Sequence, residues 1–180
     1  MAVLVTAATT ALVALLGFLF TYLHARRLQE RNDRLQRVNR QLGELYGPLF
    51  ALSDATRISY EAFCEKYKEL RSNTNWEDIS PEYVSVWQLW MTTVFQPSNK
   101  RMFELIVSNG DLLVDEAMPA CISEFCAHVA SYDVTISLWA RGDTSETFAA
   151  IDYPLLFTDY VRNSYSLLKR RQAALLADKT

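Results

Sequence analysis

Apolar and polar residues follow one another along this chain in long blocks. The first block, Ala2–Leu23, reads AVLVTAATTALVALLGFLFTYL and contains no charged residue. A helix of this length reaches roughly 33 Å, close to the bilayer's hydrocarbon thickness of about 30 Å, so it predicts a transmembrane helix over residues 2–23. A cleaved signal peptide is the alternative. We favour the anchor because no Lys or Arg precedes Arg26 and no small-residue cleavage site ends the run.

A basic helical stalk is predicted to follow over residues 24–45. It contains six arginines against three acidic residues. Because basic residues stay on the cytoplasmic side, we expect a single-pass membrane protein with its N-terminus outside and its C-terminal domain in the cytoplasm. The lipid bilayer is therefore the first expected partner. The four arginines nearest the anchor are the candidates for contact with anionic lipid headgroups: Arg26, Arg27, Arg31 and Arg34.

Apolar residues also form a stripe along the stalk with near-heptad spacing. The members of this stalk stripe are Leu28, Leu35, Val38, Leu42 and Leu45. The stripe covers at most three heptads, which is the lower limit for predicting a coiled coil. Two interpretations have equal weight. Either the stripe docks a protein partner or a second copy of the chain, or it packs on the chain's own body.

Residues 46–180 predict an acidic all-α domain, a bundle of four to five helices separated by Gly and Pro signals. The expected helices are Pro48–Leu70, Pro81–Phe95, Pro97–Val107, Pro119–Gly142 and Tyr153–Ala177. Pro97 is expected to break or kink the chain. The uncharged run Tyr83–Phe95 has apolar residues all round and predicts a central buried helix. No stretch alternates with a two-residue period, so no sheet is predicted.

The charge of the body and its cysteine content bear on the kind of partner and on the cellular compartment to be expected. Residues 46–180 contain 12 Lys and Arg against 18 Asp and Glu, a net charge of −6. Nucleic-acid binding needs a positive surface, so we expect no nucleic-acid partner. Cys64, Cys121 and Cys126 are odd in number and not tightly spaced, which favours reduced, mostly buried thiols in a cytoplasmic domain.

Candidate chemistry is confined to one region of the body. His128 is the only histidine after residue 24, and Glu124 lies four residues before it, on one helical face. Cys121, Cys126 and His128 lack zinc-ligand spacing, and no nucleophile elbow, phosphate loop or cofactor motif occurs. We therefore expect no catalytic residue, metal or cofactor, and a structural role for His128. The alternative site consists of Glu124, Cys126 and His128.

Several short motifs between residues 35 and 145 resemble those of a group of small, often membrane-anchored helical proteins of uncharacterised function. The motifs are Leu42-Gly43-Glu44-Leu45-Tyr46-Gly47-Pro48-Leu49, Leu89-Trp90-Met91, Phe95-x-Pro97-x-Asn99-x-x-Met102, Met118-Pro119 and Cys126-Ala127-His128-Val129. The resemblance implies no activity. It implies that Tyr46–Leu49 and Cys126–Val129 act together, by packing against each other.

Together these patterns predict a membrane-anchored interaction or scaffold module rather than an enzyme. The alternative is a small membrane-tethered enzyme or ligand-binding module that uses the Cys126–His128 region. A convergent polar pocket at His128 would favour the alternative, and a closed core with exposed apolar surface would favour the scaffold.

Overall fold

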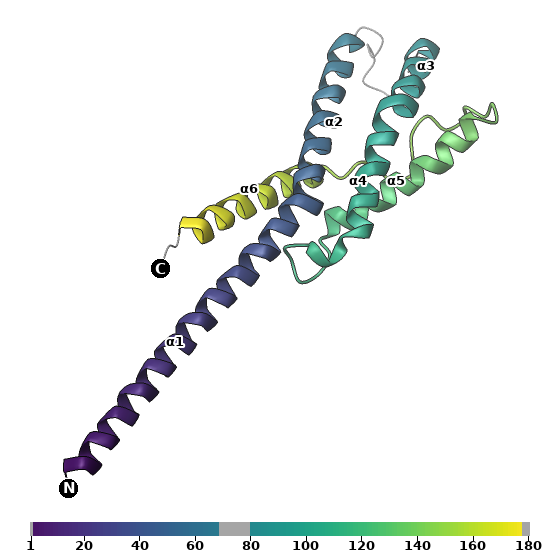
Figure 1. Cartoon of the computed structure of the whole chain (residues 1–180). Coiled ribbons are helices and arrows are strands. Elements are labelled where there is room, and N and C mark those ends of the chain that lie inside the picture. The colour runs from purple at the N-terminus through teal and green to yellow at the C-terminus, as the bar shows by residue number, and fades with distance from the viewer. Residues whose placement is uncertain (1, 69–79, 178–180) are drawn as a thin grey trace. The chain divides into compact units, whose positions relative to one another are not determined.

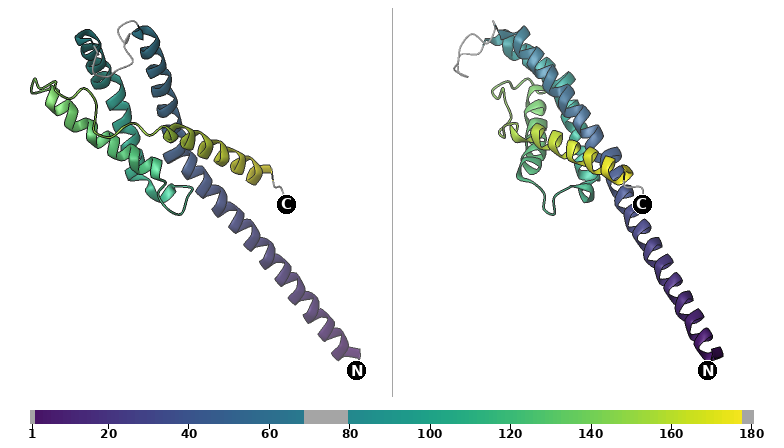
Figure 2. Two further views of the ribbon diagram at one scale, coloured as in Figure 1. Left: turned by 180° about the vertical axis from the view of Figure 1, so that it is seen from behind. Right: turned by 90° about the vertical axis from the view of Figure 1, so that its left-hand side faces the viewer.

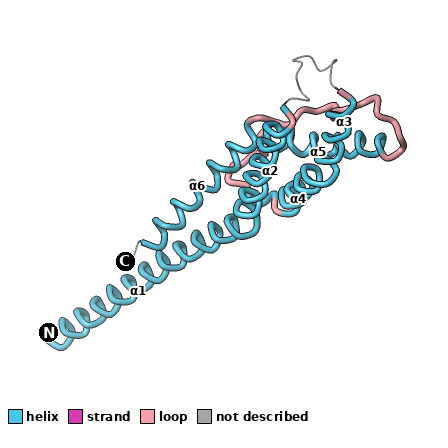
Figure 3. The backbone as a smooth tube through the Cα atoms, turned by 90° about the horizontal axis from the view of Figure 1, so that it is seen from above, coloured by secondary structure: helices cyan, strands magenta, loops and turns pink. Residues whose placement is uncertain are grey.

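The computed structural model describes the backbone of residues 2–68 and 80–177, and the side chains of residue 12 and of residues 15–68 and 80–177. Every regular element in these ranges is a helix, and Figure 3 shows no strand in them. The all-α prediction is confirmed for this part of the chain. The polar loop expected before Ser80 lies outside the described residues.

The chain forms two compact units. One consists of Met1–Asn39 with Arg170–Thr180, and the other is Arg40–Lys169. The domain boundary expected at residue 46 therefore falls inside the second unit, which includes the last residues assigned to the stalk.

Helix α1 (Ala2–Arg40) contains the predicted anchor and most of the stalk. Among the described residues, we find no helix that combines the length and the hydropathy of a membrane-crossing segment. Several side chains of Ala2–Leu23 lie outside the described residues, and the transmembrane helix stays a prediction.

The chain does not leave the helical conformation where Gly47 and Pro48 were expected to separate stalk from body. A π-helical segment, η1 (Gln41–Tyr46), follows α1 and passes directly into α2 (Gly47–Lys66). Pro48 lies in the first turn of α2, as predicted. The amide of Gly47 donates a hydrogen bond to the carbonyl of Leu42, five residues earlier.

Pro97 was expected to break or kink the chain, and no break in the helical conformation occurs there. Helix α3 (Pro81–Trp90) continues through the π-helical segment η4 (Met91–Phe95) into α4 (Gln96–Ser108). The amide of Gln96 donates to the carbonyl of Met91, again five residues earlier and again directly before a proline. A proline in an α-helix lacks its own donor and clashes with the carbonyl four residues earlier. The wider π turn shifts that carbonyl, so the helix continues through the proline.

In the second half of the chain, the observed helices agree more closely with the predicted ones. A short 3₁₀ helix, η5 (Gly110–Leu112), is followed by α5 (Ala120–Trp139) and α6 (Leu156–Ala177). Gly142, with a φ of 81°, lies just beyond α5. This left-handed conformation suits glycine and ends the helix there.

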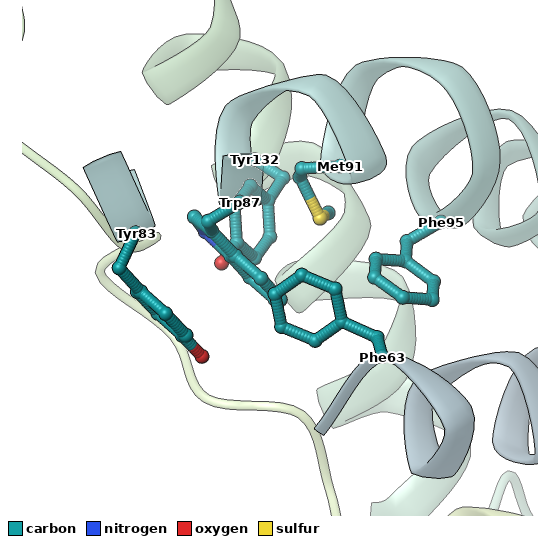
Figure 4. Close-up of a cluster of buried hydrophobic side chains, with 6 residues drawn as sticks. All are labelled: Phe63, Tyr83, Trp87, Met91, Phe95 and Tyr132. Atoms are coloured by element: carbon teal, nitrogen blue, oxygen red, sulfur yellow. The ribbon is translucent and has the colours of Figure 1, made fainter. Parts of the chain in front are cut away.

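Within the Arg40–Lys169 unit, α4 lies between α2 and α5 and packs against both (Figure 1 and Figure 2). An aromatic cluster of buried side chains fills the space between α2, the α3–η4 helix and α5. It consists of Phe63, Tyr83, Trp87, Met91, Phe95 and Tyr132 (Figure 4). The ring centroid of Phe63 lies 5.6 Å from that of Trp87 and 6.1 Å from that of Phe95. Phe63 is therefore the side chain of α2 against which the other rings of this cluster pack.

The expectation that Tyr83–Phe95 is buried on all sides is wrong. Only one side is buried, through residues spaced four apart from Tyr83 to Phe95. The opposite side carries Leu89, which is 61% exposed, and exposed Thr92 and Thr93. Both threonine hydroxyls donate to backbone carbonyls of the preceding turn, which satisfies them without any partner helix.

Candidate functional site

The stalk stripe is not a single surface. Leu28 is exposed, Leu35 and Leu42 are half-buried, Val38 is 7% exposed and Leu45 is fully buried. The assignment of Leu45 to a docking face is wrong, because this side chain is fully buried and η1, to which it belongs, packs on α4. Val38 is likewise covered by the chain itself. A protein partner or second copy on the stripe stays a prediction for Leu28, Leu35 and Leu42 alone.

The side chain of Gln41, in the last turn of the predicted stalk, forms a buried hydrogen bond to the short 3₁₀ helix η5 after α4. Its side chain is 4% exposed, and its amide donates to the carbonyl of Leu112 at 3.0 Å. A buried amide without such a partner would cost about 1–3 kcal/mol, so this bond orients the last turn of the stalk.

The first unit contains a groove of about 550 Å³ along one face of α1. Its apolar wall contains Phe20, Leu23 and Leu28, together with Leu175 from the last turns of α6. The amide of Gln172 also donates to the side chain of Asn39 at 2.8 Å. The C-terminal turns of α6 therefore lie on the stalk, so part of the stalk stripe faces its own chain.

Three of the four candidate lipid-binding arginines line this groove: Arg27, Arg31 and Arg34. Arg26 does not line it. Its guanidinium forms an ion pair with Glu30 at 3.1 Å, and both side chains are more than half exposed. The structure therefore separates Arg26 from the other three, a distinction that sequence spacing alone did not make.

His128 lies on α5 and is 5% exposed. Its Nδ1 atom lies 2.7 Å from the carbonyl oxygen of Ile151, which only accepts, so Nδ1 carries the proton. The rings of Tyr132 and Tyr153 meet the imidazole edge to face at centroid distances of 5.0 and 5.4 Å. Burial lowers the pKa of His128. The imidazole is thus held neutral between two aromatic rings and ties α5 to the loop before α6.

The other members of the alternative site do not converge on His128 in a ligand set. Glu124 is exposed and Cys126 is half-buried. Within the described ranges, no three His, Cys, Asp or Glu side chains are grouped as metal ligands would be. Burial raises the pKa of the Cys121 and Cys126 thiols, which disfavours the thiolate that a nucleophile requires.

Because His128 is buried in its neutral form, stability should depend on pH. Its folded-state pKa lies below the unfolded value of 6.5, so the unfolded chain binds more protons once the pH falls below that value. Full stability is present above it and is lost as the pH falls towards the folded pKa. Between about pH 7.5 and about pH 5.5, we expect the parent to lose about 1 kcal/mol more than His128→Gln.

Urea unfolding at the two pH values measures this difference. Equal losses in the parent and in His128→Gln would assign the pH dependence to another group.

A hydrogen-bonded chain that runs from the buried Tyr46 to the half-buried Tyr160 was not expected from the sequence. The hydroxyl of Tyr46 accepts from the amide of Val114 at 3.2 Å and lies 2.9 Å from the hydroxyl of Tyr160. Tyr160 donates to Asp115 at 2.7 Å. Burial raises the pKa of both phenols, so both stay protonated at neutral pH. Tyr46 and Tyr160 are 114 residues apart, and no local pattern indicates that they meet.

A second unexpected network joins α4 to α5. The side-chain amide of Gln96 donates to the carbonyl of Val129 at 2.9 Å and to a carboxylate oxygen of Asp133 at 2.8 Å. Lys100 forms an ion pair with the same oxygen at 2.8 Å.

The resemblance implied that Tyr46–Leu49 packs against Cys126–Val129, and the hydrogen bonds of Tyr46 and His128 can be compared with that expectation. Tyr46 bonds to Tyr160 and Val114, and His128 bonds to Ile151. Each segment thus has its own partners in the second half of the chain. Comparisons with protein-family models, curated proteins and solved structures found no match.

Proposed function

We propose that this protein is a membrane-tethered interaction module, with Ala2–Leu23 in the bilayer and the helical Arg40–Lys169 unit held close to its surface. The observation that carries the proposal is the exposure of large apolar side chains along α1. Those between residues 12 and 23 range from 44% to 74% exposed: Leu12, Leu15, Leu16, Phe18, Leu19, Phe20, Tyr22 and Leu23.

These residues surround the helix rather than forming one stripe. Leu15, Leu16, Phe18, Leu19 and Phe20 point in successive directions around α1, at 100° per residue. One partner helix covers only a single face, whereas hydrocarbon covers all of them. The run is also uncharged over 22 residues. A bilayer is therefore the partner that best matches this surface.

The proposed orientation follows from the arginines that come after the anchor. Basic residues adjoining a membrane helix stay on the cytoplasmic side, which places the helical unit in the cytoplasm. Tethering raises the effective concentration of the unit at the membrane, so a weak contact there is productive. No observation favours the enzymatic alternative, since Nδ1 of His128 is already bonded to a backbone carbonyl.

Alkaline carbonate extraction of membranes that contain the full chain tests the anchor. The parent should stay in the membrane pellet. Leu12→Arg with Leu15→Arg should move most of the chain to the supernatant, because each charge near the centre of a membrane helix costs about 3 kcal/mol. Leu155→Arg with Leu156→Arg is the matched control. Those leucines are 89% and 71% exposed but lie outside the anchor, so this variant should stay in the pellet.

Release of the parent by carbonate, or identical behaviour of the two double variants, would contradict the anchor. Protease added to intact cells tests the orientation, since the helical unit should be protected until the cells are opened.

A further inference from the structure

The groove on α1 has an apolar end and a basic end on one helical face. Eight residues of α1 between Phe20 and Arg34 line the groove. At about 100° per residue their directions fall within one half of the helix circumference, which places them on one side of α1. Phe20 and Leu23 belong to the proposed anchor. Arg27, Arg31 and Arg34 follow on the same face, so the groove runs from apolar to basic along the stalk.

The charges in the groove favour an anion. Three arginines line it against a single acidic lining residue, Glu30, so the lining carries an excess of positive charge. Side chains on an α-helix lean towards its N-terminus. The three guanidinium groups therefore lean towards the anchor, which is the direction in which the proposed function places the headgroup layer.

The second wall of the groove comes from the other end of the chain. Leu175 on α6 and Leu28 on α1 both line the groove, so its lining contains apolar surface as well as the arginines. A small soluble anion would make no favourable contact with that apolar surface. A phospholipid has both parts, a phosphate for the arginines and an acyl chain for the leucines.

We infer that this groove is a binding site for a single acidic phospholipid. Its phosphate contacts Arg27, Arg31 and Arg34, and its first acyl carbons lie against Leu23, Leu28 and Leu175. This inference rests on the proposed membrane anchor and adds a defined ligand to it. It differs from general attraction to an anionic surface, because it distinguishes arginines inside the groove from those outside.

The test uses the full chain in phosphatidylcholine nanodiscs that contain a trace of spin-labelled lipid. Electron paramagnetic resonance measures the motionally restricted fraction of labelled phosphatidylglycerol, with labelled phosphatidylcholine as the reference. The parent should prefer phosphatidylglycerol. The groove variant, Arg27→Gln with Arg31→Gln and Arg34→Gln, should lose about tenfold of that preference.

Matched controls come from outside the groove. Arg37→Gln with Arg40→Gln and Arg170→Gln removes the same number of charges from positions that do not line the groove, and should keep the preference within about twofold. Leu175→Ser should weaken the preference without changing charge. Leu176→Ser, at a neighbouring position that is 54% exposed, should leave it unchanged.

The outcomes separate the inference from the proposed function. Equal losses in the two triple variants would mean diffuse attraction and would overturn the site. Displacement of the labelled lipid by soluble glycerol phosphate would overturn the lipid assignment. A groove variant that changes chemical cross-linking between chains, with an unaltered lipid preference, would make the groove a protein interface. Failure of the parent to enter neutral nanodiscs would instead contradict the anchor itself.

Discussion

Leu45→Asp should prevent the Arg40–Lys169 unit from folding, whereas Leu28→Asp should leave it intact. Leu45 is fully buried beneath α4, and Leu28 is 45% exposed on the stalk. Removing a buried leucine side chain costs about 2–5 kcal/mol, and the buried charge adds several more. The sum approaches the total stability of an ordinary domain, about 5–15 kcal/mol.

Circular dichroism and urea unfolding of the full chain in detergent micelles measure both variants. The two substitutions are chemically identical and lie on the same predicted stripe, so their difference isolates burial. A Leu45→Asp protein with the unfolding midpoint of the parent would show that η1 does not belong to the core.

Gly47→Ala should destabilise the protein by about 1–3 kcal/mol, the usual range for forcing an extra methyl group into a filled space. A Cβ atom at residue 47 would lie 2.5 Å from the carbonyl oxygen of Leu42. That oxygen is part of the backbone and already accepts the hydrogen bond of Gly47, so the π turn itself must shift. The intrinsic preference of alanine for helices, about 1 kcal/mol over glycine, offsets only part of this cost.

Gly43→Ala provides the control within the same π-helical segment. A Cβ atom at residue 43 meets nothing within 4 Å. The variant should therefore be neutral or slightly stabilised in thermal or urea unfolding. If Gly47→Ala were as stable as Gly43→Ala, the close approach at Leu42 would not constrain the chain.

Local sequence was a good guide wherever local chemistry decides the backbone. The Ser80 hydroxyl accepts from the amide of Tyr83, and Pro81 occupies the first turn of α3, where the sequence predicted a helix to begin. Helices end at Asn109 and just before Gly142, near their expected positions. The same local rules wrongly predicted breaks in the helical conformation next to Pro48 and Pro97. A propensity rule treats proline as a helix breaker, whereas a π turn with a hydrogen bond to the fifth preceding residue lets the helix continue.

Burial was harder to predict, because hydropathy describes a residue and not its neighbours. The apolar run Tyr83–Phe95 has one exposed side because nothing in the described residues covers Leu89. Leu28 and Leu45 belong to one stripe in the sequence, yet one is exposed and the other fully buried. That difference depends on where α4 and η1 meet, which a one-dimensional pattern does not contain.

The sequence by itself determined the helical class, the uncharged first block and the basic segment after it, because composition and periodicity are local properties. Only the tertiary structure decided which arginines line the groove with Leu175 and that Tyr46 meets Tyr160. It also decided that Nδ1 of His128 is committed to Ile151. These contacts join positions far apart in the chain, and the folded packing of α1, α5 and α6 with their neighbours brings them together.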